Sequence, residues 1–271
     1  MKYAMIRSMI VPMMDAPPKE KEILDEALCG MTVEVLENSG AWYHIRTHYH
    51  YEGWVEEKHL CFDEALIRQW NEAPKKVVLQ AHADILSMPK VQGHYVAELT
   101  RGALVSPLGE VQDGWQQVRL CDGREGWTWG AFLGESVTAW DKANEPALRR
   151  AFTESALSYL GTQYRWGGKT PLGIDCSGLC SMAYLLNGVL ICRDAHILPE
   201  FPMHEIAFAD IKEGDLMFFP GHVAMYLGEK RYIHSTAGNN CHGVVINSLD
   251  PQAPDYRADL PEKLLCVGSI F

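Results

Sequence analysis

The feature that most constrains the fold of this chain is an internal repeat in its first half. Two tryptophan-containing segments recur 73 positions apart (115 − 42 = 73), without a gap: Trp42, Ile45, Arg46, Gly53, Trp54 and Leu60 correspond to Trp115, Val118, Arg119, Gly126, Trp127 and Leu133. Each copy contains short apolar-polar segments that are separated by tight turns, which is typical of small antiparallel barrels. The repeat therefore predicts two small β-barrels, at about residues 1–73 and 74–138, with a linker at 71–76.

The pattern becomes helical after the second copy of the repeat. Apolar residues between 139 and 160 recur at helical spacing: Ala147, Leu148, Ala151, Phe152, Ala156 and Tyr159. Asn144 is a candidate N-cap, and Pro146 falls in the first turn, where proline is tolerated. We expect this helix to open a third domain at 139–271, which closes with a strand within 264–271.

A cysteine stands at the predicted start of the next helix. Residues 164–179 read as a loop rich in glycine that ends in a helix, whose apolar residues follow the i, i+3, i+4, i+7 pattern: Leu179, Met182, Ala183 and Leu186. Asp175 is a candidate N-cap, which places Cys176 in the first turn. The free N–H groups and the dipole there favour a thiolate and lower the pKa of a thiol. The alternative is a small buried cysteine that only packs.

Two histidines downstream are candidates for a base that would activate this thiol. Residues 216–219 read as a strand, and 222–227 and 231–235 read as a β-hairpin. His222 and His234 point to the same face if the paired positions have an even sum, and to opposite faces after a shift of one residue. Each could instead be a structural residue of a strand. Together with Cys176, they suit a nucleophile, a base and a group that orients the base.

Composition excludes several classes of partner. The chain has 271 residues, 47% of them hydrophobic, and a net charge of −11 without a basic run, so a nucleic-acid partner is not expected. Arg7, Ser8 and Pro12 interrupt the apolar start, which does not read as a signal peptide, and no stretch reaches transmembrane length. We expect a cytoplasmic monomer without a membrane partner, or an exported one if a leader has been removed.

The cysteines and histidines outside this group do not indicate a metal site. The 8 cysteines are scattered without a Cys-x-x-Cys pair, which favours free thiols and a reducing compartment. His44, His48 and His50 fall in a predicted barrel hairpin, where we expect them to be exposed. No cofactor or metal is expected.

Five short motifs in the last half of the chain carry a family resemblance. They are Tyr-x-Trp-Gly-Gly at 164–168, Asp-Cys-Ser-Gly-Leu at 175–179, Gly-Asp-Leu-x-Phe-Phe at 214–219, His-Val-Ala-x-Tyr at 222–226 and Ile-His-Ser at 233–235. In this order they resemble the NlpC family of papain-like cysteine peptidases, which act on bacterial cell-wall peptides. The resemblance implies an α+β domain whose helix-start cysteine packs on an antiparallel sheet. It also implies that Cys176 is the nucleophile, His222 the general base and His234 the polar third residue, with Tyr164 and nearby backbone amides holding the oxyanion.

The repeated tryptophan pattern resembles bacterial SH3-like domains, and the whole arrangement resembles the γ-D-glutamyl-L-diamino-acid endopeptidases of the dipeptidyl-peptidase VI type. This resemblance implies cleavage between γ-D-Glu and diaminopimelate or lysine, in murein tripeptides or tetrapeptides with a free N-terminal L-Ala. It implies that the first SH3-like domain lines the substrate site and that Tyr51 and Asp194 hold the ammonium group. Glu22 is the candidate third partner, with Glu26 as the alternative.

Four of these residues need an assignment or have an alternative one, and three rival functions stay open. Asp175 and Ser177 are expected to shape the pocket for the D-Glu carboxylate and the peptide backbone. Tyr51 could instead be a solvent-facing strand residue, and Asp194 a loop-surface carboxylate. The rival functions are an endopeptidase of intact peptidoglycan, a papain-like amidase or acyltransferase, and a wall-binding module with an idle catalytic domain. The sequence does not distinguish diaminopimelate from lysine.

Overall fold

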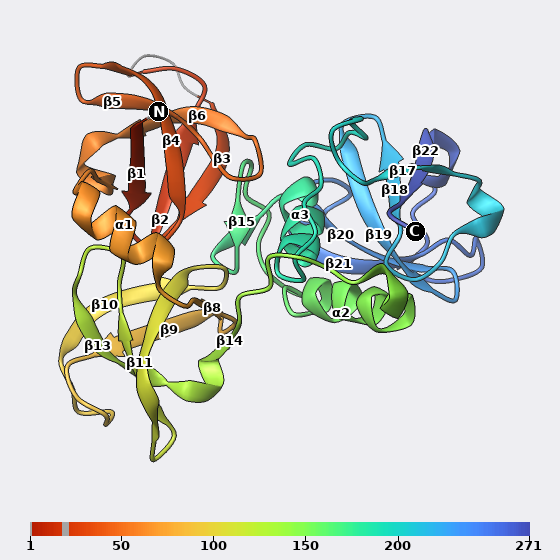
Figure 1. The fold of residues 1–271 in the computed structure, drawn as a ribbon. Helices are drawn as coiled ribbons and strands as arrows, with labels where there is room; N and C mark the ends of the chain where they lie inside the picture. The colour runs from red at the N-terminus through yellow and green to blue at the C-terminus, as the bar shows by residue number, and fades with distance from the viewer. Residues whose placement is uncertain (1, 18–21) are drawn as a thin grey trace. The chain divides into compact units, whose positions relative to one another are not determined.

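The computed structural model describes residues 2–17 and 22–271 (Figure 1). The chain divides into two compact units, Met1–Ser136 and Val137–Phe271, here called the first and the second unit.

The first unit contains two seven-stranded antiparallel sheets (Figure 1). The first sheet has the strand order β3-β2-β6-β5-β4-β1-β7. Its strands are β1 (Lys2–Ile6), β2 (Ile10–Met14), β3 (Ile23–Leu28), β4 (Thr32–Ser39), β5 (Trp42–Arg46), β6 (Glu52–Glu56) and β7 (Leu60–Cys61). A short 3-10 turn, η1 (Glu57–His59), precedes β7, and helix α1 (Glu64–Glu72) follows it.

The second sheet repeats this topology with the order β10-β9-β13-β12-β11-β8-β14. Its strands are β8 (Lys76–Val78), β9 (His82–Leu86), β10 (Tyr95–Thr100), β11 (Leu104–Gln112), β12 (Trp115–Arg119), β13 (Glu125–Trp129) and β14 (Leu133–Glu135). A 3-10 turn, η2 (Gly130–Phe132), precedes β14 as η1 precedes β7.

Strand pairing confirms the internal repeat. Arg46 pairs with Glu52 between β5 and β6, and Arg119 pairs with Glu125 between β12 and β13, so both partners are shifted by 73 positions. Earlier in the two sheets, Gly30 and Gly102 occupy corresponding tight turns with φ of 88° and 91°, a conformation that favours glycine, yet they are only 72 apart (102 − 30 = 72). Between this glycine turn and the first tryptophan of the repeat, the second copy therefore contains one residue more than the first.

The predicted linker is shorter than expected, because α1 continues to Glu72 and β8 begins at Lys76. Trp70 of α1 is buried and donates its indole N–H to the Gly30 carbonyl at 2.9 Å. This contact ties the helix to the first sheet and leaves only residues 73–75 between α1 and β8.

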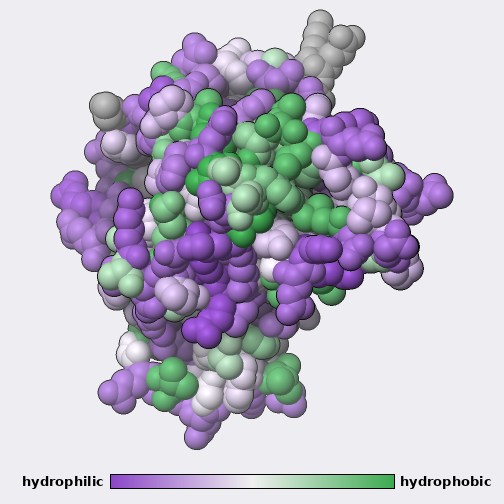
Figure 2. Space-filling model, turned by 90° about the vertical axis from the view of Figure 1, so that its right-hand side faces the viewer, coloured by the Kyte–Doolittle hydropathy of each residue, from purple (hydrophilic) through white to green (hydrophobic). Residues whose placement is uncertain are grey.

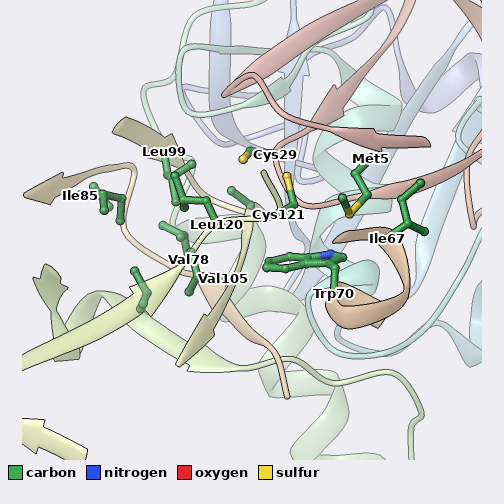
Figure 3. Packing of buried hydrophobic residues seen from close by; sticks show 13 residues of the cluster. Met5, Cys29, Ile67, Trp70, Val78, Ile85, Leu99, Val105, Leu120 and Cys121 are labelled. Atoms are coloured by element: carbon green, nitrogen blue, oxygen red, sulfur yellow. The ribbon is translucent and has the colours of Figure 1, made fainter. Parts of the chain in front are cut away.

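The two sheets of the first unit share one apolar core. Figure 3 shows this cluster, whose labelled residues come from both sheets and from α1: Met5, Cys29, Ile67, Trp70, Val78, Ile85, Leu99, Val105, Leu120 and Cys121. All ten are at most 8% exposed. Burial of apolar surface is the main favourable term in folding, so the shared cluster couples the two barrels.

The second unit is an α+β domain, as predicted. Its antiparallel six-stranded sheet has the order β17-β22-β18-β19-β20-β21. The strands are β17 (His204–Ile206), β18 (Leu216–Phe219), β19 (His222–Gly228), β20 (Arg231–Thr236), β21 (Gly243–Ser248) and β22 (Cys266–Ser269). Two very short strands, β15 (Lys169–Thr170) and β16 (Gly173–Ile174), form a separate ribbon, and the 3-10 turns are η3 (Lys142–Asn144), η4 (Phe208–Asp210) and η5 (Pro261–Lys263).

Two helices cover this domain, α2 (Glu145–Leu157) and α3 (Cys176–Leu185) (Figure 1). The rings of Phe152 and Tyr184 stack at 4.1 Å and join the helices, while α3 packs against β19 and β20. Asn144 occupies the N-cap position of α2, but its side chain makes no capping hydrogen bond. The packing of the buried face, more than the cap, therefore holds α2 in place.

A buried ion pair anchors α2 to the Gly-Asp motif. Arg149 donates to Asp215 Oδ1 and to the Glu213 carbonyl, each at 2.8 Å, and both charged side chains are less than a tenth exposed. The motif aspartate thus has a structural partner.

None of the helices in the described ranges is long and apolar enough to cross a membrane. All eight cysteines are free thiols, as expected from their spacing. Figure 2 shows hydrophilic residues over most of the face that it presents, with the largest group of apolar residues in its upper half and smaller ones near its lower end.

Candidate active site

The start of α3 has the predicted geometry. Asp175 is the N-cap, and its Oδ1 accepts a hydrogen bond from the Gly178 N–H at 2.6 Å, so Cys176 is the first helical residue. The loop that precedes the helix lies directly against it, because a Cβ on Gly178 would overlap the carbonyl oxygen of Gly168. Glycine is therefore required at 178, whereas at 168 it is required by another contact, because a Cβ on Gly168 would overlap the carbonyl oxygen of Gly173.

A buried arginine holds both neighbours of the cysteine. Arg193 is 2% exposed and pairs with both carboxylate oxygens of Asp175 at 3.1 Å. It also donates to Ser177 Oγ at 2.8 Å. Asp175 and Ser177 are themselves buried, so their visible role is to fix the helix start. Their contact with a substrate stays a prediction, and the sequence did not single out Arg193.

The expectation of a lowered pKa for Cys176 is wrong in this structure. Burial raises the pKa of the thiol to about 11, and the negative charge of Asp175 adds to this effect. The backbone N–H groups of Val223 and Ser177 and the charge of Arg193 lower the pKa but do not outweigh burial. The thiol therefore keeps its proton at neutral pH and requires a base.

The hairpin register brings the two histidines to one face. Met225 pairs with Ile233 and Tyr226 with Tyr232, so the paired positions have an even sum, and a bulge at Gly228 absorbs the odd residue near the turn. His222 Nε2 and His234 Nδ1 lie 2.8 Å apart. The prediction that His222 and His234 point to the same face of the sheet is confirmed.

Two contacts place the hairpin beside the start of α3. The backbone N–H of Val223, the residue after His222, hydrogen-bonds to the sulfur of Cys176. Ser235, the residue after His234, donates its hydroxyl to the Ile174 carbonyl at 2.6 Å. The motifs that contain the cysteine and the histidines therefore meet in one place.

Burial keeps both histidines neutral. It lowers the pKa of His222 to about 3, and the neighbouring His234 and Arg257 act in the same direction. It lowers the pKa of His234 to about 4, against the hydrogen bond that His234 donates to Asn247, which raises it. At neutral pH His222 therefore carries a lone pair that can accept a proton.

Comparison with known proteins agrees with this geometry. The chain is 41% identical over 272 residues to dipeptidyl-peptidase 6 of Lysinibacillus sphaericus, with 99% of each chain covered. Residues 161–258 match the NlpC/P60 family. The chain belongs to the NlpC/P60 family. It is a cysteine peptidase of the dipeptidyl-peptidase VI type.

Other matches extend over the first unit of this NlpC/P60 protein. Residues 13–60 match the bacterial dipeptidyl-peptidase SH3 domain. The γ-D-glutamyl-L-lysine dipeptidyl-peptidase of Bacillus cereus is 28% identical over 232 residues, with 78% of this chain and 66% of that protein covered. A solved NlpC/P60 family protein from Bacillus cereus shares the fold, with a TM-score of 0.80, 20% identity and 98% of each chain covered. The prediction of SH3-like domains ahead of an NlpC domain is confirmed.

Tyr164 lies close to Cys176. Burial raises the pKa of its hydroxyl, and the negative charges of Cys176 and Asp175 raise it further. The phenol is therefore protonated and has an O–H to donate at neutral pH. Its part in an oxyanion site stays a prediction.

Asp194 lies on an exposed loop next to Ser177. Both line a hollow of about 10 Å³ whose other walls include Cys180, Met203 and Val223. A space of this size holds about one water molecule. Asp194 is thus close to the start of α3 and exposed to solvent.

The other predicted substrate-binding residues belong to the first unit. Tyr51 lies just before β6, and its backbone N–H bonds to Thr47 Oγ1 at 3.1 Å. Glu22 is exposed, whereas Glu26 in β3 is 4% exposed. Next to it, buried Asp25 accepts a hydrogen bond from the Tyr49 hydroxyl at 2.6 Å. The roles of Tyr51, Glu22 and Glu26 stay predictions.

Within residues 2–17 and 22–271, one group of side chains has the composition of a metal site: His82, Asp84 and Glu98. It lies on β9 and β10 of the first unit, not among the residues around Cys176. His48 and His50 are exposed, as expected, but His44 is half-buried because it stacks on Trp54 at 5.1 Å.

Proposed function

We propose that this NlpC/P60 peptidase hydrolyses the bond between γ-D-Glu and the following diamino acid in cell-wall peptides that begin with a free L-Ala. Its relatives named dipeptidyl-peptidase 6 and γ-D-glutamyl-L-lysine dipeptidyl-peptidase support this substrate class. The observation that carries the proposal is a first-turn cysteine beside a histidine pair whose ring nitrogens are 2.8 Å apart. The products are L-Ala-γ-D-Glu and the released diamino-acid peptide.

The reaction starts with a proton transfer. His222 takes the thiol proton of Cys176 as the sulfur attacks the γ-carbonyl carbon of D-Glu. The tetrahedral oxyanion is held by backbone N–H groups at the start of α3 and by the Tyr164 hydroxyl. The imidazolium of His222 then protonates the amine of the diamino acid, which leaves, and a thioester remains.

Water completes the cycle. His222, neutral again, removes a proton from a water molecule that attacks the thioester carbonyl. The carbon–sulfur bond breaks, the acid product L-Ala-γ-D-Glu is released, and the proton returns to the sulfur of Cys176. Since the raised pKa keeps the resting thiol protonated, base and nucleophile act in the same step.

Asp194 is the residue of the second unit that we assign to the N-terminal ammonium group. Its carboxylate is exposed to incoming substrate and shares a hollow with Ser177, the residue after the nucleophile. Asp194→Ala is expected to raise KM for the free-amine peptide more than it lowers kcat. An unchanged KM would remove Asp194 from this role.

A free N-terminal L-Ala exists only after a peptide has been released from the glycan, so the proposed substrate is a released fragment. The test is mass spectrometry of two parallel digests, one of L-Ala-γ-D-Glu-diaminopimelate and one of the same peptide still linked to N-acetylmuramic acid. Cleavage of the first alone supports the proposal. Cleavage of both would indicate a hydrolase of the intact wall, and cleavage of neither would contradict the peptidase.

Cys176→Ala is the control for both digests. It removes the nucleophile and is expected to abolish cleavage without unfolding the domain, because only one sulfur atom is lost. Turnover by this variant would assign the reaction to another residue or to a contaminant.

A further inference from the structure

The polar side chain behind the histidine pair is Asn247 on β21. Its Oδ1 lies 2.9 Å from His234 Nε2, and its Nδ2 donates to the backbone carbonyl of Asp255 at 2.7 Å. The strand pairing places Asn247 opposite Tyr232, two positions along β20 from His234, so Asn247 and His234 are diagonal neighbours on the same face of the sheet. Four groups thus form one hydrogen-bond chain that runs from the Asp255 carbonyl through Asn247 and His234 to His222.

The Asp255 carbonyl, at one end of this series of hydrogen bonds, determines the direction of all of them. A backbone carbonyl can only accept, so the amide nitrogen of Asn247 faces Asp255 and its oxygen faces His234. His234 must then carry its proton on Nε2 and leave Nδ1 as an acceptor. Because His234 Nδ1 accepts, His222 donates from Nε2 and keeps the lone pair on Nδ1.

The histidines alone do not determine this arrangement. Each neutral ring has two tautomers, and the reversed chain would also satisfy the 2.8 Å contact. In the reversed chain His222 Nδ1 would carry a proton, and that nitrogen could not act as a base. The orientation of the Asn247 amide therefore decides which nitrogen of His222 is free.

We propose that Asn247 is the positioning residue that sets the tautomers of His234 and His222 and thereby leaves Nδ1 of His222 ready to take the Cys176 proton. This rests on the proposed function, in which His222 is the base. When His222 becomes an imidazolium, its Nε2–H still donates to His234, so no bond of the chain has to reverse during the cycle.

The charged side chains near the histidines are paired with one another, so the neutral amide of Asn247 is the group that sets the tautomers. Arg257 and Asp259 act on both rings with opposite signs, but they pair with each other at 2.6 Å. The side chain of Asp255 pairs with Arg231 at 3.0 Å. A carboxylate at position 247 would accept from His234 equally well, but its charge would stabilise the imidazolium form.

The test compares Asn247→Leu with the wild-type full chain. Loss of the amide is expected to lower kcat for the free-amine peptide by about 10- to 100-fold, the usual range when an orienting partner of a functional histidine is removed. KM should stay within about twofold, because the substrate does not touch Asn247. Alkylation of Cys176 by iodoacetamide at neutral pH, followed on its own peptide by mass spectrometry, should slow by a similar factor.

Asn247→Asp is the conservative variant. It keeps an oxygen acceptor for His234 and adds a negative charge, so kcat should exceed that of Asn247→Leu while the acid limb of the kcat/KM profile moves to higher pH. If Asn247 only supported the fold, the retained acceptor would not matter, and kcat of Asn247→Asp would not exceed that of Asn247→Leu.

Asn187→Leu is the matched control. Asn187 is also a half-buried amide of the second unit, and its Nδ2 contacts Ala183, Ser155 and Ala151 at 2.8, 2.9 and 3.3 Å, just beyond the far end of α3 from Cys176. This variant should lose stability but keep the kinetics and the alkylation rate of the wild type.

Three results would overturn the inference: unchanged kcat and alkylation in Asn247→Leu, an unshifted pH profile in Asn247→Asp, or an equal kinetic loss in Asn187→Leu. If the wild type is active and Cys176→Ala is inactive, any of these results contradicts only the role of Asn247 and not the proposed function. An active Cys176→Ala variant would instead remove the proposed function itself.

Discussion

Two buried ion pairs of the second unit contrast with the repeated, exposed pairs of the first unit. In the first unit the equivalent pairs Arg46–Glu52 and Arg119–Glu125 lie on the outside of their sheets, with each side chain between 33% and 41% exposed. In the second unit Arg149–Asp215 and Arg193–Asp175 are less than a tenth exposed. One partner of each buried pair, Asp215 or Asp175, lies in a motif of the NlpC/P60 domain.

This difference indicates what each unit depends on. An exposed ion pair contributes little to stability, whereas removing one partner of a buried pair leaves a charge without compensation. The barrels rely mainly on their shared apolar core, although β3 also buries Asp25 and Glu26. The NlpC/P60 domain couples its stability to the groups that fix Cys176 and its surroundings.

The largest effect is expected from breaking a buried pair. Arg193→Met leaves the Asp175 carboxylate buried without its cation and should lower the free energy of unfolding of the second unit by about 3–5 kcal/mol. Hydrogen exchange read on peptides from residues 137–271 measures this loss. A loss below about 1 kcal/mol, the usual worth of an exposed pair, would erase the distinction between the two units.

A somewhat smaller loss is expected from the apolar core of the first unit. Leu99→Ala removes a side chain that is 1% exposed and should cost about 3 kcal/mol. Because the cluster includes residues of both sheets, exchange should accelerate in peptides from 22–61 as well as from 76–135. Acceleration confined to 76–135 would show that the barrels are not coupled through this core.

Acid should destabilise the second unit through its histidines. The pKa values of His222 and His234 lie below 6.5 in the folded protein, so the unfolded chain binds more protons once the pH falls below that value. Each histidine should therefore remove about 1.4 kcal/mol of stability per pH unit between about pH 6 and 4.

Urea unfolding at pH 7 and pH 5 measures this loss. It should be smaller in a His222→Gln/His234→Gln variant, whereas exposed His82→Gln should behave as the wild type. Equal acid sensitivity of the double variant and the wild type would contradict burial of the pair in its neutral form.

The smallest effect is expected at the exposed pair of the second barrel. Arg119→Met makes the same change as Arg193→Met but leaves Glu125 in contact with solvent, so the cost should be about 0–1 kcal/mol. Hydrogen exchange in residues 76–135 checks this value. A loss as large as that of Arg193→Met would show that burial does not account for the contrast.

Much of the site could be read from the sequence because its signals are local. The repeat of Trp42 and Trp115 predicted matching strand registers, and Asp175 marked the start of the helix that begins with Cys176. The even-sum condition for His222 and His234 also follows from alternation along strands. The local sequence assigned no role to Arg193 or Asn247, because their partners are distant in the chain: Asp175 is 18 residues from Arg193, and His234 is 13 residues from Asn247.

The sequence by itself determined the order of the domains, the helix-start cysteine and the parity of the histidine hairpin, because helix caps and strand alternation depend on near neighbours. Only the tertiary structure decided the protonation of these groups. The raised pKa of Cys176 and the lowered pKa values of His222 and His234 arise mainly from burial by residues distant in the chain. Likewise, the amide of Asn247 reaches His234 only because β20 and β21 pair, and the Asp255 carbonyl orients it from outside the sheet.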